Sequence, residues 1–192
     1  MLRFSFTVLL IGLLAAQPVL AEQFVVELLE PSSGLPRAIA ENDEVSVHET
    51  LSGTSESYVI FTAPDLRALE QFFRSEGIAA RKISEVLFVN SPELAGADPP
   101  GVLAREGHRV FVIERPVPGV GFFGIERKRQ ISRASKAAIA VLGVVIEWQK
   151  SYLTSDGTYC IYRADSTETL REHGALAGAP VGKITPVIQR TH

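Results

Sequence analysis

The chain has 192 residues, of which 46% are hydrophobic and 21% charged, a composition typical of globular proteins and unlike that of disordered or fibrous ones. Its single cysteine excludes an intramolecular disulfide framework and the cysteine-rich zinc and iron–sulfur sites. The formal net charge of -3 lacks the basic surplus of a nucleic-acid-binding surface, so we expect no nucleic-acid partner.

The first 21 residues have the pattern of a secretory signal peptide. A short basic start ends at Arg3, an apolar segment follows over residues 4–16, and Val19-Leu20-Ala21 offers a cleavage site. The apolar segment is shorter than the roughly 20 residues that cross a bilayer. We therefore expect cleavage after Ala21, a periplasmic or secreted protein, and no transmembrane segment in the mature chain. An uncleaved N-terminal anchor is the alternative.

The remaining chain contains an internal duplication. Two segments of the first half recur in the same order in the second half. They are Phe24-Val25-Val26-Glu27, which recurs as Phe111-Val112-Ile113-Glu114, and Tyr58-Val59-Ile60-Phe61, which recurs as Tyr159-Cys160-Ile161-Tyr162. The sequence thus predicts one repeat over residues 22–90 and another over residues 107–190. Residues 91–106, rich in proline and glycine, form the predicted linker.

Each repeat is predicted to follow the order β-α-β-β-α-β. In the first, a helix of barely two turns over residues 37–41 precedes a strand over residues 43–51. A second helix is expected from Pro64 through Phe73, with Leu66, Leu69 and Phe73 facing inward.

The second repeat begins with a predicted strand over residues 109–115 and a helix over residues 125–144. Ile131, Ala134, Ala138 and Leu142 form the apolar stripe of that helix. Strands over residues 144–153 and 157–163 flank an Asp-Gly hairpin turn. Ser166 is expected to cap the last helix, before a closing strand over residues 183–189.

An ordered series of motifs runs through the second repeat. The motifs are Val112-Ile113-Glu114-Arg115, Trp148-x-x-Ser151-Tyr152, Asp156, Tyr159-Cys160-Ile161-Tyr162, Gly178-Ala179-Pro180-Val181 and Ile184-x-x-Val187. In this order they resemble a bacterial domain family of otherwise unknown function that includes nickel-binding, nickel-responsive proteins. The resemblance implies a ferredoxin-like domain that commonly pairs into dimers, and it makes a divalent metal such as nickel a candidate cofactor.

The duplication and the resemblance together predict an α+β fold. Two tandem ferredoxin-like βαββαβ repeats would pack sheet to sheet as a pseudo-dimer, in the manner of a dimeric α/β barrel. One repeat alone would be a marginal domain, so each repeat is expected to need the other.

This chain has a different residue at the place where the nickel-binding members of that family have a metal ligand. Those members carry a histidine two residues after the tryptophan, where this chain has Lys150, whose ammonium offers no lone pair. The equivalent place in the first repeat is Glu49, preceded by His48. His48 is therefore the candidate metal ligand. Adjacent strand residues face opposite sides, so His48 and Glu49 cannot hold one ion together, and a solvent-facing histidine is the alternative.

Further candidates for ligand binding lie in the strands. Glu27 and Glu114 occupy equivalent places within apolar segments, where a carboxylate needs a partner. A cross-strand ion pair of Glu27 with Lys82, and of Glu114 with Lys183, is one interpretation, and a ligand-facing acid is the other.

Three alternating residues, Trp148, Lys150 and Tyr152, are predicted to share one face of a strand. They could line a pocket for an anionic aromatic ligand, or pack in a core between the repeats. Cys160 is expected to be buried and unreactive.

One basic cluster stands out, over residues 127–136, formed by Arg127, Lys128, Arg129, Arg133 and Lys136. It is interpreted as a solvated helix face or as a docking surface for an acidic partner.

No set of acid, base and nucleophile is visible. The sequence therefore favours a periplasmic or secreted, non-enzymatic module that binds a small ligand or a metal ion such as nickel between its two repeats. The candidate ligand-binding residues are Glu27, His48, Glu49, Glu114, Trp148, Lys150 and Tyr152. The alternatives are a small enzyme of the dimeric α/β-barrel type, monooxygenase-like or isomerase-like, and a protein-interaction scaffold.

Overall fold

The computed structural model of the protein describes residues 21–29, 42, 44–97 and 106–192. Residues 1–20 of the predicted signal peptide, the short helix predicted over residues 37–41 and much of the predicted linker lie outside this part. Within it, no helix is both long and apolar enough to cross a membrane.

The first half of the described chain contains four strands and one α-helix. The elements are β1 (Glu22–Leu28), β2 (Ser46–Ser52), β3 (Ser57–Ala63), α2 (Leu66–Glu76) and β4 (Ala80–Glu85). The strands are antiparallel and lie in the order β4-β1-β3-β2.

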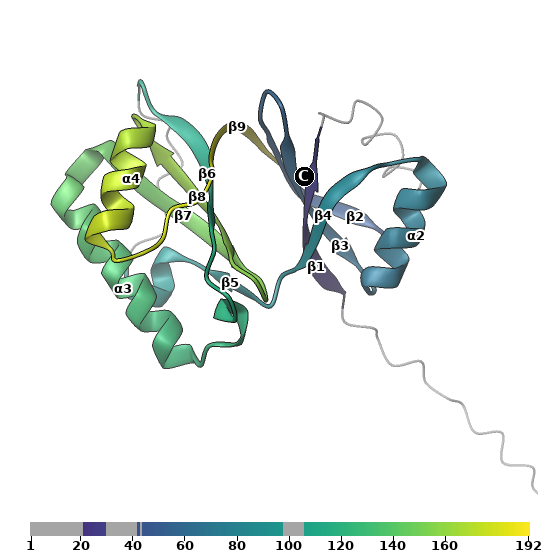
Figure 1. Ribbon diagram of the computed structural model, residues 1–192, viewed down its shortest axis with the longest axis horizontal. Coiled ribbons are helices and arrows are strands. Elements are labelled where there is room, and N and C mark those ends of the chain that lie inside the picture. The colour runs from purple at the N-terminus through teal and green to yellow at the C-terminus, as the bar shows by residue number, and fades with distance from the viewer. Residues whose placement is uncertain (1–20, 30–41, 43, 98–105) are drawn as a thin grey trace, which may run out of the picture.

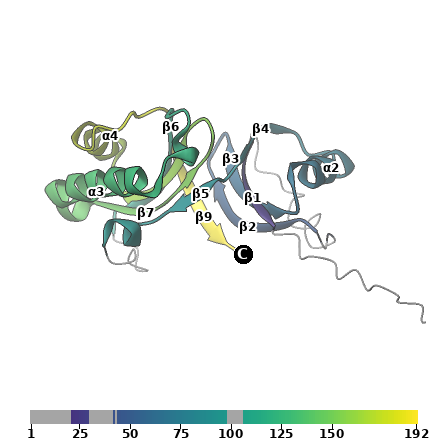
Figure 2. The same cartoon turned by 90° about the horizontal axis from the view of Figure 1, so that it is seen from below.

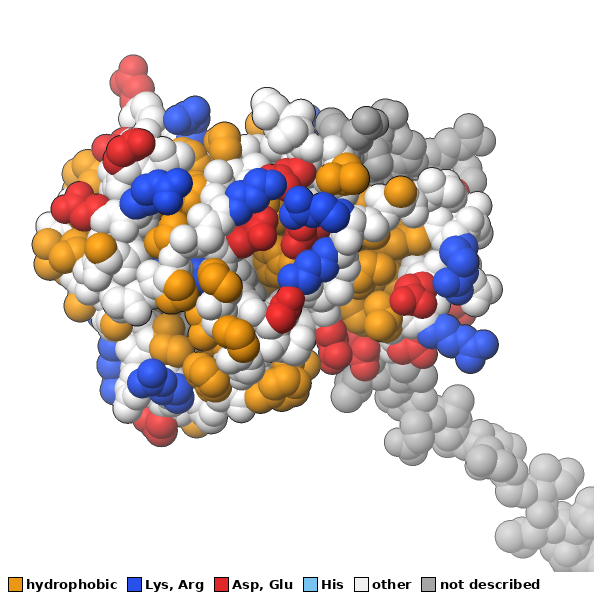
Figure 3. Space-filling view, viewed as in Figure 1, with side chains coloured by type: hydrophobic (Ala, Val, Ile, Leu, Met, Phe, Trp, Pro, Cys, Tyr) orange, Lys and Arg blue, Asp and Glu red, His pale blue; other side chains and the backbone are white. Residues whose placement is uncertain are grey.

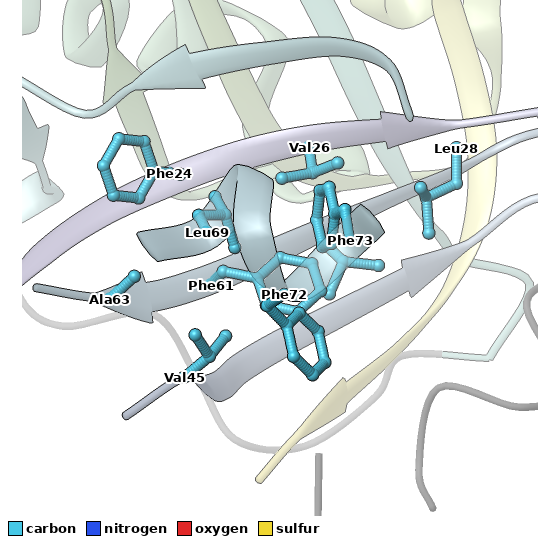
Figure 4. Close-up of a cluster of buried hydrophobic side chains, with 10 residues drawn as sticks. Phe24, Val26, Leu28, Val45, Phe61, Ala63, Leu69, Phe72 and Phe73 are labelled. Atoms are coloured by element: carbon cyan, nitrogen blue, oxygen red, sulfur yellow. The ribbon is translucent and has the colours of Figure 1, made fainter. Parts of the chain in front are cut away.

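Helix α2 begins two residues later than predicted, at Leu66 instead of Pro64. Asp65 is its N-cap, and the Asp65 carboxylate accepts a hydrogen bond from the Ala68 amide. Phe72 and Phe73 pack onto Phe61 of β3, as Figure 4 shows, whereas Leu66 points outward at the end of the helix. The predicted inward place of Leu66 is thus wrong, because Leu66 is the first residue of the helix, whereas Leu69 and Phe73 on the same stripe are buried as predicted.

The second half contains five strands and two α-helices. The elements are β5 (Phe88–Asn90), β6 (Arg109–Arg115), α3 (Ile125–Leu142), β7 (Ile146–Leu153), β8 (Thr158–Ala164), α4 (Thr167–Leu176) and β9 (Ile184–Thr191), with 3₁₀ turns over Pro92–Ala95, Val120–Phe122 and Gly143–Val145. Its strand order is β9-β6-β8-β7-β5. β5 pairs with β7, although the sequence places residues 88–90 at the end of the first repeat.

Strand β9 connects the two halves. Its first residues pair with β6 and its last residues pair with β2, which gives one nine-stranded antiparallel sheet. The helices cover the outer sides of the two halves (Figures 1 and 2). The fold is therefore mixed α+β, with three α-helices in the described residues.

Buried side chains form three clusters. One lies between α2 and the first half of the sheet, and another lies beneath α3 and α4. The middle cluster takes side chains from both halves, namely Val25, Leu51, Tyr58, Ile60, Val112, Tyr152, Tyr159 and Ile161. The two halves thus share one hydrophobic core.

β-Bulges in β2 and β7 shift the side-chain alternation of these two strands. The register changes at His48 in β2 and at Gln149 in β7. An extra residue moves the later residues of the strand to the other face of the sheet. Trp148 consequently lies in the cluster under the helices, while Tyr152 lies in the middle cluster. The prediction that Trp148, Lys150 and Tyr152 share one face is wrong for this reason.

Helix α3 buries part of the predicted apolar stripe together with polar residues. Ala138 is buried as predicted and Leu142 packs against the cluster under the helices, but Lys128, Ser132 and Ser135 are buried as well. The apolar pattern did not indicate these polar residues, because they lie against a cavity whose walls carry polar as well as apolar side chains. Only part of the predicted basic surface remains free for an acidic partner, since Lys128 is buried and Arg129 pairs with Glu126.

Candidate active site in the C-terminal half

A cavity of about 360 Å³ lies between the two helices of the second half and its sheet. Apolar walls come from residues including Val117, Val120, Phe123, Ile131, Trp148 and Leu153. Polar side chains reach it from several elements: Arg115 from the end of β6, Ser135 and Lys128 from α3, Tyr162 from β8 and His173 from α4. An apolar cavity with a few convergent polar groups is the usual form of a small-molecule site.

Arg115 is the most strongly buried cation of the cavity, with 6% of its surface exposed. Its Nη1 donates to the Pro180 carbonyl at 2.7 Å, and its Nη2 donates to His173 Nδ1 at 3.4 Å. The guanidinium also contacts Cys160 and Tyr162. No carboxylate of the described residues lies within 4.0 Å of it. Burying a cation without an acid is costly, so the site favours an anion.

The backbone holds Arg115 at a fixed place. Gly157, in the turn between β7 and β8, lies directly against the Arg115 carbonyl oxygen, and a Cβ at that position would overlap it. The adjoining Glu114 carbonyl accepts a hydrogen bond from the Gly182 amide at 2.9 Å.

His173 is almost wholly buried, with 1% exposed. Burial, helped by the Arg115 charge, lowers the pKa of His173 to about 4, so the imidazole is neutral near pH 7. Because Arg115 donates to Nδ1, the proton is assigned to Nε2, which lies 3.1 Å from Ser135 Oγ. His173 therefore donates to Ser135 and cannot take its proton, which excludes a serine nucleophile activated by this histidine.

The chain of hydrogen bonds ends at Tyr162. Its hydroxyl lies 3.1 Å from Ser135 Oγ, and burial raises the pKa of Tyr162 to about 12. The phenol thus stays protonated and can donate. Arg115 and Tyr162 both line the cavity and both carry donors, the kind of groups that stabilise a negatively charged oxygen. Cys160 is buried as predicted, but it also lines this cavity, with Thr158 Oγ1 3.0 Å from its sulfur.

Three of the residues predicted for ligand binding come together outside this cavity. Glu49, which is fully buried, accepts hydrogen bonds from Tyr152 Oη at 2.7 Å and Gln189 Nε2 at 2.6 Å, and Lys150 Nζ lies 3.1 Å away. These groups satisfy one another at the middle cluster.

The two equivalent glutamates, Glu27 and Glu114, bind tyrosines of the opposite half. Tyr159 Oη donates to Glu27 and Tyr58 Oη donates to Glu114, both at 2.6 Å. Glu27 also pairs with Arg81. Figure 3 shows acidic and basic side chains gathered between the two halves of the molecule.

The predicted lysine partners of these glutamates are wrong. Lys82 pairs with Asp156, and Lys183 pairs with Glu56. The physical reason in the first half is a bulge in β4, where Glu27 is paired with Lys82 and Leu28 with Ala80. The extra residue, Arg81, is thereby brought to Glu27.

The described residues do not fit a metal site. His48 is exposed on the bulge of β2, and they contain no group of three or more His, Cys, Asp or Glu side chains able to hold an ion. At the places equivalent to the histidine of the nickel-binding proteins, Lys150 and Glu49 form an ion pair with each other. Of the predicted site residues, only Trp148 lines the cavity, and its Nε1 donates to Ser151 Oγ at 3.0 Å.

Arg115, Ser135, Tyr162 and His173 line the cavity but were not among the site residues predicted from the sequence. Sequence signals could have indicated two of them, Tyr162 and His173. Cys160 and Tyr162 alternate on one face of β8, and His173 lies three residues after Leu170 on the inner face of α4.

Several solved structures are similar to this chain. A mutant chlorite dismutase from Candidatus Nitrospira defluvii has a TM-score of 0.49 at 10% identity, with 90% of this chain and 92% of that chain covered. An anthrone oxidase-like protein has a TM-score of 0.46 at 10% identity, with 89% and 93% covered. A proposed monooxygenase from Lactobacillus acidophilus NCFM has a TM-score of 0.39 at 10% identity, with 88% and 93% covered. No curated protein matches the chain.

The expectation of a non-enzymatic module is not kept. The similar structures are named as a dismutase, a monooxygenase and an oxidase-like protein, and these names describe those proteins. The polar groups that converge in the cavity of this chain were not expected from the sequence, and they favour the alternative, an enzyme, over the non-enzymatic module.

The second half of the chain also matches a family model. Residues 111–187, which include most of the cavity wall, match the model described as nickel responsive protein SCO4226-like. The match supports that family for this part of the chain.

Proposed function

We propose that the protein is a small enzyme that acts on a phenol or an enolisable ketone bound in the cavity of its second half. The observation that carries the proposal is Arg115, a buried cation that faces the cavity and has no acidic partner among the described residues. A substrate oxygen that becomes negative during the reaction would supply the missing charge.

The chemistry follows from the protonation states around Arg115. Tyr162 keeps its proton and His173 is neutral, so the cavity holds donors and the cations Arg115, Arg127 and Lys128 but no carboxylate. Such a site lowers the pKa of a bound phenol or ketone, because it stabilises the phenolate or enolate, and the released proton passes to solvent water. Removing one donor from an anion-stabilising site commonly lowers the rate about 10²- to 10³-fold. Isomerase-type and monooxygenase-type reactions can both start from this electron-rich anion.

Phenylpyruvate, an aromatic keto acid, tests the proposed activity. The protein should accelerate its keto–enol conversion, followed by the ultraviolet absorbance of the enol, and Arg115→Met should return the rate to the uncatalysed value. Arg133→Met is the matched control, because Arg133 is exposed on α3 and does not line the cavity. A wild-type rate equal to the uncatalysed rate, or an Arg115→Met rate equal to wild type, would contradict the proposal.

We also propose that the chain consists of two tandem ferredoxin-like repeats that form a pseudo-dimer, and that it is periplasmic or secreted. The strand orders β4-β1-β3-β2 and β9-β6-β8-β7 correspond to each other and support the two repeats. The reciprocal bonds from Tyr58 to Glu114 and from Tyr159 to Glu27 support them as well. A periplasmic or secreted location rests on the sequence pattern of residues 1–21 alone.

A further inference from the structure

Lys128, near the start of α3, is a second buried cation of the cavity. Only 8% of the residue is exposed, whereas Arg127, which also lines the cavity, and the other members of the basic cluster are exposed or half-buried. Its Nζ donates to the Gly121 carbonyl at 2.9 Å and lies 4.3 Å from the centre of the Phe88 ring. The side chain is thus turned inward and held at a defined place in the cavity wall.

No carboxylate of the described residues lies within 4.0 Å of Lys128 Nζ. The ammonium has three protons, of which Gly121 takes one. Two basic neighbours on the same helix have other environments. Arg129 pairs with Glu126, and Lys136 is exposed and donates to the Gly96 carbonyl. Elsewhere the chain pairs its buried charges, as Glu49 does with Lys150. An unpaired ammonium in this wall is therefore unusual for this molecule.

Arg115 and Lys128 reach the cavity from different elements, β6 and α3. One anionic oxygen satisfies one of them and leaves the other without a counter-charge. We infer that the substrate carries a second, permanently anionic group, such as a carboxylate, which Lys128 binds while Arg115 faces the reacting oxygen. This inference rests on the function proposed above and narrows its substrate class to aromatic hydroxy acids and keto acids.

Calorimetric titration of the protein with phenol, 3-hydroxybenzoate and 4-hydroxybenzoate tests this role. Hydrogen bonds between charged groups are markedly stronger than neutral ones, so at least one hydroxybenzoate should bind about tenfold or more tightly than phenol. Lys128→Gln should abolish that preference and leave the affinity for phenol unchanged, because the amide can still donate to Gly121. Lys128→Arg should keep the preference, and Arg133→Met should change nothing.

The outcomes separate the two proposals. Equal binding of phenol and both hydroxybenzoates by the wild type, or a preference that survives in Lys128→Gln, overturns the role of Lys128 while the function of Arg115 stands. Failure of all three ligands to bind overturns the proposed function as well. If Lys128→Gln does not fold, Lys128→Met replaces it as the uncharged variant. Its binding is then compared with that of Lys128→Arg, which keeps the positive charge.

Discussion

Buried charged residues of this protein fall into two groups. Glu27, Glu49 and Glu56 are buried, and each pairs with an arginine or a lysine. Arg115 and Lys128 are equally buried and have no acid within 4.0 Å in the described part of the chain. The first group stabilises the junction of the two halves, whereas the second lines the cavity. The candidate site therefore differs from the junction of the two halves in that its buried charges have no partner of opposite charge.

His173 should make the stability depend on pH. Its pKa falls from 6.5 to about 4 on folding, so between these values the unfolded chain binds a proton that the folded chain does not. The free energy of unfolding should therefore be unaffected by His173 above pH 6.5 and decrease as the pH falls through this window, by about 3 kcal/mol in total. Urea denaturation between pH 4.5 and 7.5 measures the slope.

Replacing His173 separates its contribution to the pH dependence of unfolding from the contribution of the carboxylates. His173→Gln should reduce the pH dependence over the same window, while His48→Gln, on the exposed bulge of β2, should leave it as in the wild type. Parallel curves for wild type and His173→Gln would show that the pKa of His173 does not change on folding, and they would contradict the lowered pKa assigned to it.

At the scale of elements, the close approach of the β7–β8 turn to β6 positions Arg115. Gly157→Ala would place a methyl group against the Arg115 carbonyl oxygen, so the end of β6 must shift. We expect a loss of stability of about 1–3 kcal/mol, measured by urea denaturation, together with weaker hydroxybenzoate binding. Gly124→Ala is the control, because nothing lies within 4 Å of that position, and it should affect neither. An unchanged Gly157→Ala protein would mean that this turn does not position Arg115.

The regular elements were predictable from the sequence, and the bulges were not. The strand predicted over residues 109–115 coincides with Arg109–Arg115, and the predicted cap Ser166 accepts a hydrogen bond from the Thr169 amide. Alternation and capping depend on neighbours in the chain, so a local pattern shows them. The extra residues His48 and Gln149 depend on pairing with other strands. One bulge in β7 was enough to place Trp148 and Tyr152 on opposite faces.

The candidate site was harder to predict than the fold for a related reason. Its polar groups come from β6, β8, α3 and α4, and no two of them form a recognised sequence motif. Lys128 and Ser135 occupy a helix face that hydropathy alone assigns to solvent. Only the packing of α3 over the sheet turns that face into a cavity wall.

For the whole molecule, the junction of the halves depends on reciprocal bonds. Tyr58→Phe and Tyr159→Phe each remove a hydroxyl that donates to a glutamate of the other half. Hydrogen bonds to charged groups contribute about 1.5–3 kcal/mol each, so each variant should lose roughly that amount of unfolding free energy. The chain should still unfold in one transition, because both halves share the middle cluster.

The control for these tyrosine variants is Ser75→Ala, which removes an exposed hydroxyl that donates to the Phe72 carbonyl within α2. Urea denaturation followed by fluorescence and by circular dichroism should give coincident curves for all variants. Two separate transitions in the wild type would contradict a shared core.

In the proposed function, Arg115 stabilises an anionic oxygen in the cavity of the second half. A pH titration of bound 4-nitrophenol, whose phenolate absorbs visible light, measures this stabilisation directly. The bound probe should ionise at a pH lower than the free probe by about one unit or more, equivalent to about 1.4 kcal/mol, and Arg115→Met should remove the difference. A bound probe that titrates like the free one, or a shift that persists without Arg115, would contradict the account.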